Sequence, residues 1–294
     1  MKACPRLPPP TLKNSPEGRR LTKNPLANPG QGSSALRSFA EHFQLERGGP
    51  EELLVESAAT AFASLPYENL TKILKHDRVG GAARRGPEEV IGDHLRLGSG
   101  GTCFSLTAAL LHILRGLGLH AEPILADRHY GENTHCALLV WLDGNPHLLD
   151  PGYLILKPLP LPGNKELEQV VPTVFNEVLL RHRDQGSKIE LHTRQQGTVS
   201  HRLTFKPEPA EDRDFLDAWD ASFGWEMMRY PLLTRVCDGG QLYLQGARFQ
   251  RRSRKEVERT ELSAARDIAR NFGLEEGLVR QALSAFSRRG EHHD

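Results

Sequence analysis

Cys103 has the surroundings of a reactive thiol. It follows the glycine-rich run 98–102 and opens a mostly apolar stretch, predicted to be a helix ending near Gly116 or Gly118. Unpaired backbone N–H groups and the positive end of the helix dipole stabilise a thiolate there, and Thr102 is the expected N-cap. The glycines are expected to form a flexible loop that lets a substrate approach the backbone closely. We therefore predict that Cys103 is a nucleophile, whereas the other three cysteines fit the ordinary role of small apolar residues.

A base and a carboxylate to orient it are predicted on a hairpin further along the chain. His135 begins an apolar run, and Asp143-Gly144 is a strong signal for a two-residue hairpin loop. With that loop Asp150 lies opposite Ala137, and Ala137 is two residues from His135 on the same face of the hairpin. Asp150 and His135 are then diagonal neighbours about 7–8 Å apart, within reach of a hydrogen bond between their side chains. A four-residue loop would instead place Asp150 opposite Leu139 and out of range. In the first register the carboxylate fixes the imidazole tautomer while the other ring nitrogen faces the thiol.

The periodicity of the apolar residues changes around this group. Spacings of three and four from about residue 35 to 97 predict helices, broken at 48–50 and at Pro66. Beyond the helix that starts at Cys103, alternation predicts antiparallel strands at 121–126, 136–142, 147–150, 188–192 and 199–205. A strand at 241–249 and helices at 255–272 and 274–286 are expected to follow. Residues 1–33 are rich in proline and glycine, which predicts a disordered tail.

Composition narrows the class of protein. The formal net charge of +1 favours neither a nucleic acid nor an anionic membrane as partner. Four cysteines without paired spacing do not predict a disulfide framework or a zinc site. No stretch approaches the roughly 18 apolar residues of a membrane span, and no apolar segment follows the basic residues at the N-terminus. We expect a cytoplasmic protein.

Three blocks of sequence resemble the catalytic blocks of the arylamine N-acetyltransferases. They are Gly-Gly-Thr-Cys103-Phe, Thr-His135-Cys-Ala-Leu-Leu-Val and Leu-Leu-Asp150-Pro-Gly-Tyr, in the same order and at similar intervals. Upstream, Leu-Pro-Tyr-Glu-Asn-Leu at 65–70 is similar to the family's Pro-Phe-Glu-Asn-Leu segment, and 218–222 and 240–248 resemble its later strand region. The resemblance covers about residues 35 to 290.

The resemblance implies an α+β fold with a cysteine-proteinase-like core in three parts. A helical bundle, 34–118, would carry the nucleophile. A central antiparallel β-barrel, 119–210, would carry His135 and Asp150. A C-terminal α/β lid, 211–294, would complete the molecule.

The resemblance also implies an acyltransferase with a ping-pong reaction. Cys103 would attack the thioester of acetyl-coenzyme A, and an amine would then be acylated with His135 as proton acceptor and Asp150 as the third member of the triad. Acetyl-coenzyme A would be a substrate, with no metal and no permanently bound cofactor. The substrate-binding residues implied are Gly100, Gly101, Thr102, Phe104, Gly152 and Tyr153.

Four positions depart from the family pattern. Where the family usually has Arg-Gly-Gly-x-Cys-Phe-Glu-x-Asn, this chain has Ser99, Ser105 and Thr107 at the Arg, Glu and Asn positions. Two opposite charges are thus lost together, which avoids leaving one of them buried alone. Leu154 stands at the second glycine of the family's Gly-Phe-Gly, where a larger side chain is expected to narrow a substrate slot.

Other functions remain open at this point. They are an amide synthase with a carrier-bound acyl donor, a thiol protease or transglutaminase with another acceptor, and a catalytically silent binding protein. The basic run 248–259 could meet coenzyme phosphates, but its interleaved glutamates favour a solvated helix face. The acceptor amine, the natural acyl donor and the oligomeric state are not indicated by the sequence.

Overall fold

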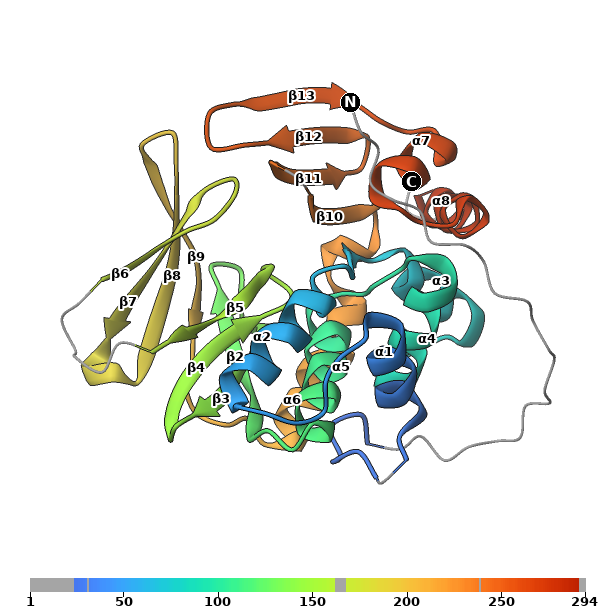
Figure 1. Cartoon of the computed structure of the whole chain (residues 1–294). Coiled ribbons are helices and arrows are strands. Elements are labelled where there is room, and N and C mark those ends of the chain that lie inside the picture. The colour runs from blue at the N-terminus through green and yellow to red at the C-terminus, as the bar shows by residue number, and fades with distance from the viewer. Residues whose placement is uncertain (1–23, 31, 162–167, 238, 291–294) are drawn as a thin grey trace.

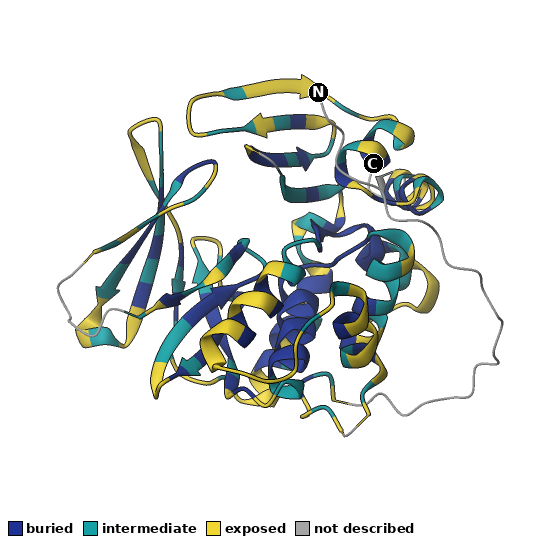
Figure 2. Ribbon diagram, viewed as in Figure 1, coloured by how far each residue is buried: buried dark blue, intermediate teal, exposed yellow. Residues whose placement is uncertain are grey.

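Five helices form the first part of the chain, and the last of them, α5, begins at Cys103. The computed structural model describes residues 24–30, 32–161, 168–237 and 239–290. Helix α5 is buried from Cys103 to Leu114 because it is apolar on nearly every side, and it lies at the centre of Figure 2 in dark blue. The predicted helical spacing is confirmed by α1 (Ser34–Phe43), α2 (Glu51–Phe62), α3 (Leu70–Val79), α4 (Pro87–Leu97) and α5 (Cys103–Gly116).

The described part of the predicted tail packs against these helices. Leu26 is buried, and its carbonyl accepts a hydrogen bond from Arg115 Nη1 at 2.7 Å. Ser33 caps α1, accepting a hydrogen bond from Leu36 N at 3.2 Å. Residues 1–23 and 31 of the predicted tail lie outside the described residues. Residues 24–30 therefore belong to the packed part of the chain although the tail was predicted to reach residue 33, because Leu26 offers an apolar side chain that the fold buries.

A curled, wholly antiparallel eight-stranded sheet forms the middle of the molecule (Figure 1). Its order is β5-β4-β3-β2-β9-β8-β7-β6, so β5 and β6 are its edges and the predicted barrel is a half-barrel. All five predicted strands are confirmed. The prolines of β5 and β6 hid these two edge strands from the pattern, since proline is confined to strand edges and ends. The strands are β2 (Ala121–Arg128), β3 (Gly131–Leu142), β4 (Asn145–Asp150), β5 (Ile155–Pro160), β6 (Gln169–Pro172), β7 (Glu177–Arg183), β8 (Lys188–Gln195) and β9 (Thr198–Phe205). A short 3₁₀ turn, η1 (Asp184–Gly186), joins β7 to β8.

A second sheet of five strands, β1-β10-β11-β12-β13, follows in the C-terminal part. Its first strand, β1, comes from the N-terminal half and pairs with β10, while Tyr67 also bridges Gly101 beside the nucleophile. The α+β class is confirmed. The remaining elements are β1 (Tyr67–Glu68), α6 (Asp212–Ala221), η2 (Ser222–Gly224), η3 (Glu226–Met228), β10 (Leu232–Cys237), β11 (Gly240–Gln245), β12 (Arg248–Arg252), β13 (Val257–Glu261), α7 (Ala265–Phe272) and α8 (Glu276–Gly290).

Two predictions for this part were wrong. The single strand expected at 241–249 is a hairpin of β11 and β12 that turns at Gly246, where φ is 60°. The helix expected at 255–272 begins only at Ala265, and the basic run lies on β12 and β13 instead of on a helix face. Its glutamates alternate with arginines because the two signs face each other across the strands, Arg248 opposite Glu261 and Arg251 opposite Glu258.

The boundaries at 118 and 210 stay predictions, although two contacts cross them. Strand β1 belongs to the C-terminal sheet, and α6 places Trp219 against Phe104 of α5, ring centroids 6.1 Å apart.

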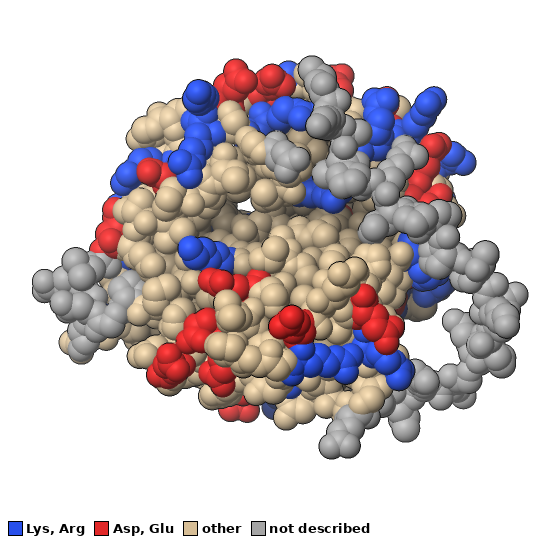
Figure 3. All heavy atoms as spheres, in the orientation of Figure 1, with Lys and Arg blue, Asp and Glu red and all other residues tan. Residues whose placement is uncertain are grey.

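On the face drawn in Figure 3, the surface is hollowed between the C-terminal sheet and the rest of the molecule. No helix of the described residues has the length and apolar character that crossing a membrane requires.

Candidate active site

The hairpin of β3 and β4 brings His135 and Asp150 together. Leu142 pairs with Asn145 across a two-residue loop, Asp143 and Gly144, whose φ angles of 48° and 74° are those of a type I′ turn. The Asp150 Oδ2 atom lies 2.7 Å from His135 Nε2, and both side chains are 0% exposed. The two-residue register is therefore the one the chain adopts, and the His–carboxylate contact predicted from it is present.

Cys103 is the first residue of α5, and its side chain lies against the imidazole of His135. A Cβ atom placed on Gly152 would lie 2.8 Å from Cys103 Cβ and 2.9 Å from His135 Cε1. The Cys103 sulfur raises the pKa of His135, and since Nε2 faces Asp150, Nδ1 is the ring nitrogen left for the sulfur. Sulfur, imidazole and carboxylate thus follow one another in the order that a nucleophile, its base and an orienting group require.

The surroundings of the pair favour a thiolate beside an imidazolium. A hydrogen bond from Cys136 lowers the pKa of Cys103 and burial raises it. The hydrogen bond and charge of His135 and the charge of Arg128 lower it further. The pKa of Cys103 therefore lies well below the ordinary value of a thiol. Burial alone would lower the pKa of His135, but the charge and hydrogen bond of Asp150 together with the Cys103 sulfur raise it to about 9. A thiolate at neutral pH is therefore supported by a helix N-terminus, an imidazolium and a guanidinium.

The second oxygen of the carboxylate is also held. Tyr153 N donates to Asp150 Oδ1 at 2.8 Å, so each Asp150 oxygen has a donor. This fixes which oxygen faces His135. The turn after β4, residues 151–154, thereby positions both the carboxylate and the glycine that packs on the catalytic pair.

The glycine-rich run packs closely against neighbouring parts of the chain. A Cβ on Gly100 would lie 1.9 Å from the Pro66 carbonyl oxygen, and one on Gly101 would lie 2.3 Å from Ser105 Oγ. Gly100 N donates to Glu68 Oε1 at 3.2 Å, and its carbonyl accepts from Arg85 Nη1 at 2.6 Å. These glycines allow close packing on Pro66 and on α5, which differs from the open loop expected from the sequence.

The other implied substrate residues differ in how far they can reach a substrate. Phe104 is 0% exposed and packs among Phe215, Trp219 and Trp225, so the structure places it in the core, out of reach of a substrate. Successive helix residues point about 100° apart, which turns Phe104 away from the face that Cys103 uses. Thr102 is buried, and it occupies the N-cap position without a side-chain capping bond. Gly152 and Tyr153 are half-buried and remain beside the catalytic pair.

The four positions that depart from the family pattern carry uncharged side chains. Ser99 Oγ is buried without a hydrogen-bond partner, and Ser105 Oγ donates to the Thr102 carbonyl at 3.0 Å. Thr107 Oγ1 lies 3.4 Å from Cys136 Sγ, within hydrogen-bond reach. Leu154 has a φ of 62°, a conformation that L residues with a side chain rarely adopt. The backbone thus keeps the shape of a glycine turn although the glycine has been replaced.

Arg85 is the positively charged partner of the buried carboxylate of Glu68. The two side chains are 0% and 3% exposed and 3.9 Å apart, and Arg85 also binds Asp93 at 2.8 Å. The pair lies directly beneath Gly100. The support that it gives to the nucleophile loop explains how the loop tolerates Ser99 at the family's arginine position.

Two residues near the sulfur were missed by sequence reasoning. Arg128, at the end of β2, has Nη2 3.1 Å from His135 Nδ1, and Cys136 adjoins both Cys103 and Thr107. Cys136 could have been found from its place beside His135 on β3. Arg128 could not, because a register shift between Ala126 and Arg128 re-aims its side chain.

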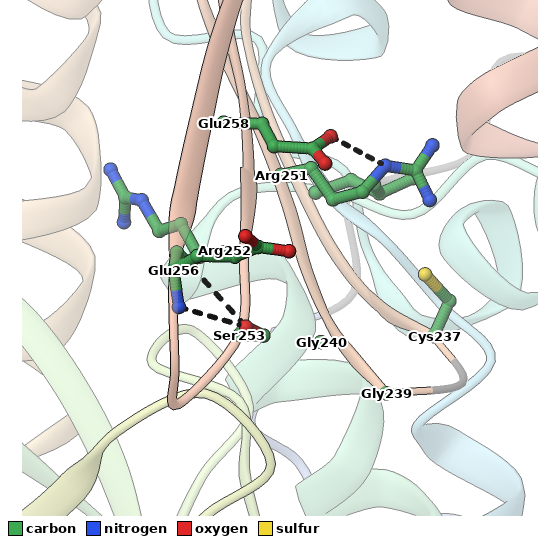
Figure 4. Close-up of a pocket in the computed structure, with 9 residues that line it drawn as sticks. Cys237, Gly239, Gly240, Arg251, Arg252, Ser253, Glu256 and Glu258 are labelled. Atoms are coloured by element: carbon green, nitrogen blue, oxygen red, sulfur yellow. Dashed lines mark hydrogen bonds and ion pairs between the residues drawn. The ribbon is translucent and has the colours of Figure 1, made fainter.

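A separate cavity of about 190 Å³ lies in the C-terminal sheet (Figure 4). It is lined by Cys237 at the end of β10 and by the β12–β13 hairpin, including Arg251, Arg252 and Glu258. None of the three residues of the catalytic group lines it. Its described lining has two arginines, Arg251 and Arg252, and two glutamates, Glu256 and Glu258, whose formal charges balance. Among the described residues, no group of three or more His, Cys, Asp and Glu side chains could hold a metal ion.

The comparisons with known proteins agree with this arrangement. A family model described as N-acetyltransferase matches residues 52–275. The arylamine N-acetyltransferase of Mycobacterium smegmatis is 19% identical and has a TM-score of 0.70, with 85% of this chain and 98% of that chain covered. The enzyme of Salmonella typhimurium is 21% identical, with a TM-score of 0.65 and coverage of 86% and 99%.

A third similar structure concerns the triad itself. It is an arylamine N-acetyltransferase of Bacillus cereus described as having a unique Cys-His-Glu catalytic triad, 16% identical with a TM-score of 0.65 and coverage of 83% and 99%. At these identities the structures establish the fold. No curated protein sequence matched the chain.

Proposed function

Since the chain belongs to the arylamine N-acetyltransferase family and is an enzyme of that type, we propose that it transfers an acyl group from coenzyme A to an amine through a thioester on Cys103. The observation that carries this proposal is the contact of Cys103 with a histidine that is itself held by a buried carboxylate. His135 Nε2 lies 2.7 Å from Asp150 Oδ2, which leaves Nδ1 for the sulfur.

The first half of the reaction loads the enzyme. The Cys103 thiolate attacks the carbonyl carbon of the acyl-coenzyme A thioester, and the carbon–sulfur bond to coenzyme A breaks. The His135 imidazolium gives its Nδ1 proton to the departing coenzyme A sulfur. The low pKa of Cys103 and the pKa of about 9 of His135 supply both the nucleophile and the proton at neutral pH.

The second half transfers the acyl group. The amine nitrogen attacks the Cys103 thioester, neutral His135 accepts a proton from that nitrogen at Nδ1, and the Cys103 thiolate leaves. The ion pair is thereby restored. Asp150 holds the ring in one orientation throughout, so the same nitrogen serves as acid and then as base.

In this proposal acetyl-coenzyme A is a donor substrate, and the chain needs neither a resident cofactor nor a metal. The acceptor is a small-molecule amine, and the cytoplasm, where coenzyme A thioesters are available, is the proposed location. Gly152 and Tyr153 border the reacting sulfur. Thr102 and Gly101 support the backbone at the start of α5.

A second candidate is an amide synthase that takes its acyl group from a carrier. Leu154 favours it, because a leucine replaces a glycine at the turn that packs on the catalytic pair and so alters the space beside it. Poor turnover of simple arylamines, together with better turnover of a bulkier or carrier-bound partner, would favour this candidate.

The test is the mass of the intact protein after mixing with acetyl-coenzyme A and no amine. One acetyl group should appear on Cys103, be absent in Cys103→Ala, and disappear when an accepted amine is added. Cys237→Ala should behave as the wild type. If no thioester tried gives an acylated Cys103, the protein is a silent binding protein on this fold and the proposal fails.

A further inference from the structure

Arg128 presents a guanidinium to the catalytic pair. It lies at the end of β2 as a half-buried residue, and its Nη2 is 3.1 Å from His135 Nδ1. Its Nε is buried without a hydrogen-bond partner. Among the residues that the structure describes, no ion pair joins Arg128 to an aspartate or glutamate. An unsatisfied donor on a buried charge is costly, which makes this position one where a ligand is expected.

The two nitrogens form one edge of the guanidinium. Nε and Nη2 of arginine donate in parallel, and this fork matches the two oxygens of a carboxylate. When His135 carries a proton on Nδ1, that atom cannot accept from Nη2. In the protonated state of the histidine both donors of this edge are therefore available to a ligand.

The neighbouring groups do not supply a permanent counter-charge. Burial raises the pKa values of Tyr67, Tyr130 and Tyr153, so these hydroxyls are neutral at neutral pH. Arg128 opposes this effect at Tyr130, whose pKa its charge lowers. The nearby anion is the Cys103 thiolate, whose charge disappears when the sulfur is acylated.

We propose that the Nε–Nη2 edge of Arg128 binds a carboxylate that the substrate carries close to its reacting centre, on the acyl group or on the amine. The inference rests on the proposed acyl transfer and specifies its substrate class. The coenzyme phosphates cannot fill this place, because the pantetheine arm separates them from the thioester. A single carbonyl oxyanion would use one donor of the fork, whereas a carboxylate uses both and restores the lost negative charge.

The experiment compares matched substrates on wild type, Arg128→Gln and Arg128→Lys. The first arm sets malonyl-coenzyme A against propionyl-coenzyme A as donors. The second sets 2-aminobenzoate against aniline as acceptors, with acetyl-coenzyme A as donor. Arg213→Gln, a change on the exposed face of α6, is the control.

In one arm, Arg128→Gln should lower the ratio of kcat/KM for the charged over the neutral substrate by about 10- to 100-fold, which is the usual strength of a charged hydrogen bond. Arg128→Lys keeps the positive charge but loses the pair of parallel donors. Its ratio should therefore lie between those of the wild type and Arg128→Gln. The arm that responds identifies the carrier of the carboxylate. A ratio unchanged in both arms, including an equal loss for charged and neutral substrates, overturns the proposal and assigns Arg128 to the thiolate alone.

A binding measurement separates this inference from the proposed function. Malonate and 2-aminobenzoate are titrated calorimetrically into Cys103→Ala, with and without Arg128→Gln. Binding of either that is lost with Arg128→Gln supports the carboxylate site even if no donor acylates Cys103. Binding that is absent, or equal in both proteins, counts against the site whatever the activity.

Discussion

Replacing Asp150 by Asn removes one negative charge from the catalytic group and keeps the side-chain shape. Tyr153 N donates to Oδ1 at 2.8 Å, so the amide oxygen of the new Asn will take that place. Its NH2 group then faces His135 Nε2, which must become an acceptor. The imidazole proton moves to Nδ1, and the neutral ring loses the lone pair that the second half-reaction needs.

The charge effect can be sized from the same contact. Burial lowers the pKa of His135, and the charge and hydrogen bond of Asp150, with the Cys103 sulfur, more than offset it, so that the pKa is about 9 against about 6.5 for an ordinary histidine. At about 1.4 kcal/mol per pKa unit this difference corresponds to roughly 3 kcal/mol. In Asp150→Asn, burial and Arg128 both lower the pKa of His135, opposed by Cys103. We expect acyl transfer to fall roughly 10³-fold or more, since the tautomer change adds to the charge effect.

The assay follows coenzyme A release during a single turnover, together with alkylation of Cys103 by iodoacetamide between pH 5 and 9. In the wild type, alkylation should stay fast well below the pH at which ordinary thiols become unreactive. In Asp150→Asn the labelling profile should move to higher pH. Asp150→Glu keeps the charge and is the control, expected to retain much more activity. If Asp150→Asn stays within tenfold of the wild type and labels at the same pH, the orienting role is refuted.

Three further changes address the neighbours of the triad. Gly152→Ala puts a Cβ 2.8 Å from Cys103 Cβ and 2.9 Å from His135 Cε1, so it should lower acylation about 10²-fold and cost about 1–3 kcal/mol in thermal unfolding; unaltered kinetics would contradict the close packing. Leu154→Gly should relieve about 1 kcal/mol of backbone strain, raise Tm and improve turnover of small arylamines, whereas Leu154→Ala should keep the strain; equal Tm values for the two would argue against it. Cys136→Ala should raise the pKa of Cys103, seen as slower alkylation at pH 6, while Cys237→Ala should label like the wild type.

The parts of the site that follow short-range rules could be predicted from the sequence. The period of two along a strand and the Asp143-Gly144 turn fix the face of Asp150, and the end of a glycine run fixes the start of α5. Each of these rules acts within a few residues. The order helix, strand, helix could be predicted for the same reason.

What escaped prediction depends on contacts between distant segments or on a neighbouring strand. Phe104 adjoins the nucleophile in sequence, but the turn of the helix sends it to Phe215. Gly100 was expected to face a substrate and instead faces the Pro66 carbonyl. The charges of 248–259 fit a helix face or a strand pair equally well, and the cross-strand partners that decide between them are visible in the fold.

Strand β1 makes the catalytic centre depend on the order in which the chain is synthesised. Tyr67 bridges Gly101 on one side and pairs with Thr234 on the other, so the backbone beside the nucleophile is completed by a strand made much later. Until β10 emerges from the ribosome, β1 has an open edge and Asn69 lacks the partners it finds at Tyr230 and Leu232. A nascent chain that already contains Cys103, His135 and Asp150 is therefore expected to lack the completed backbone beside Cys103 until β10 has been made.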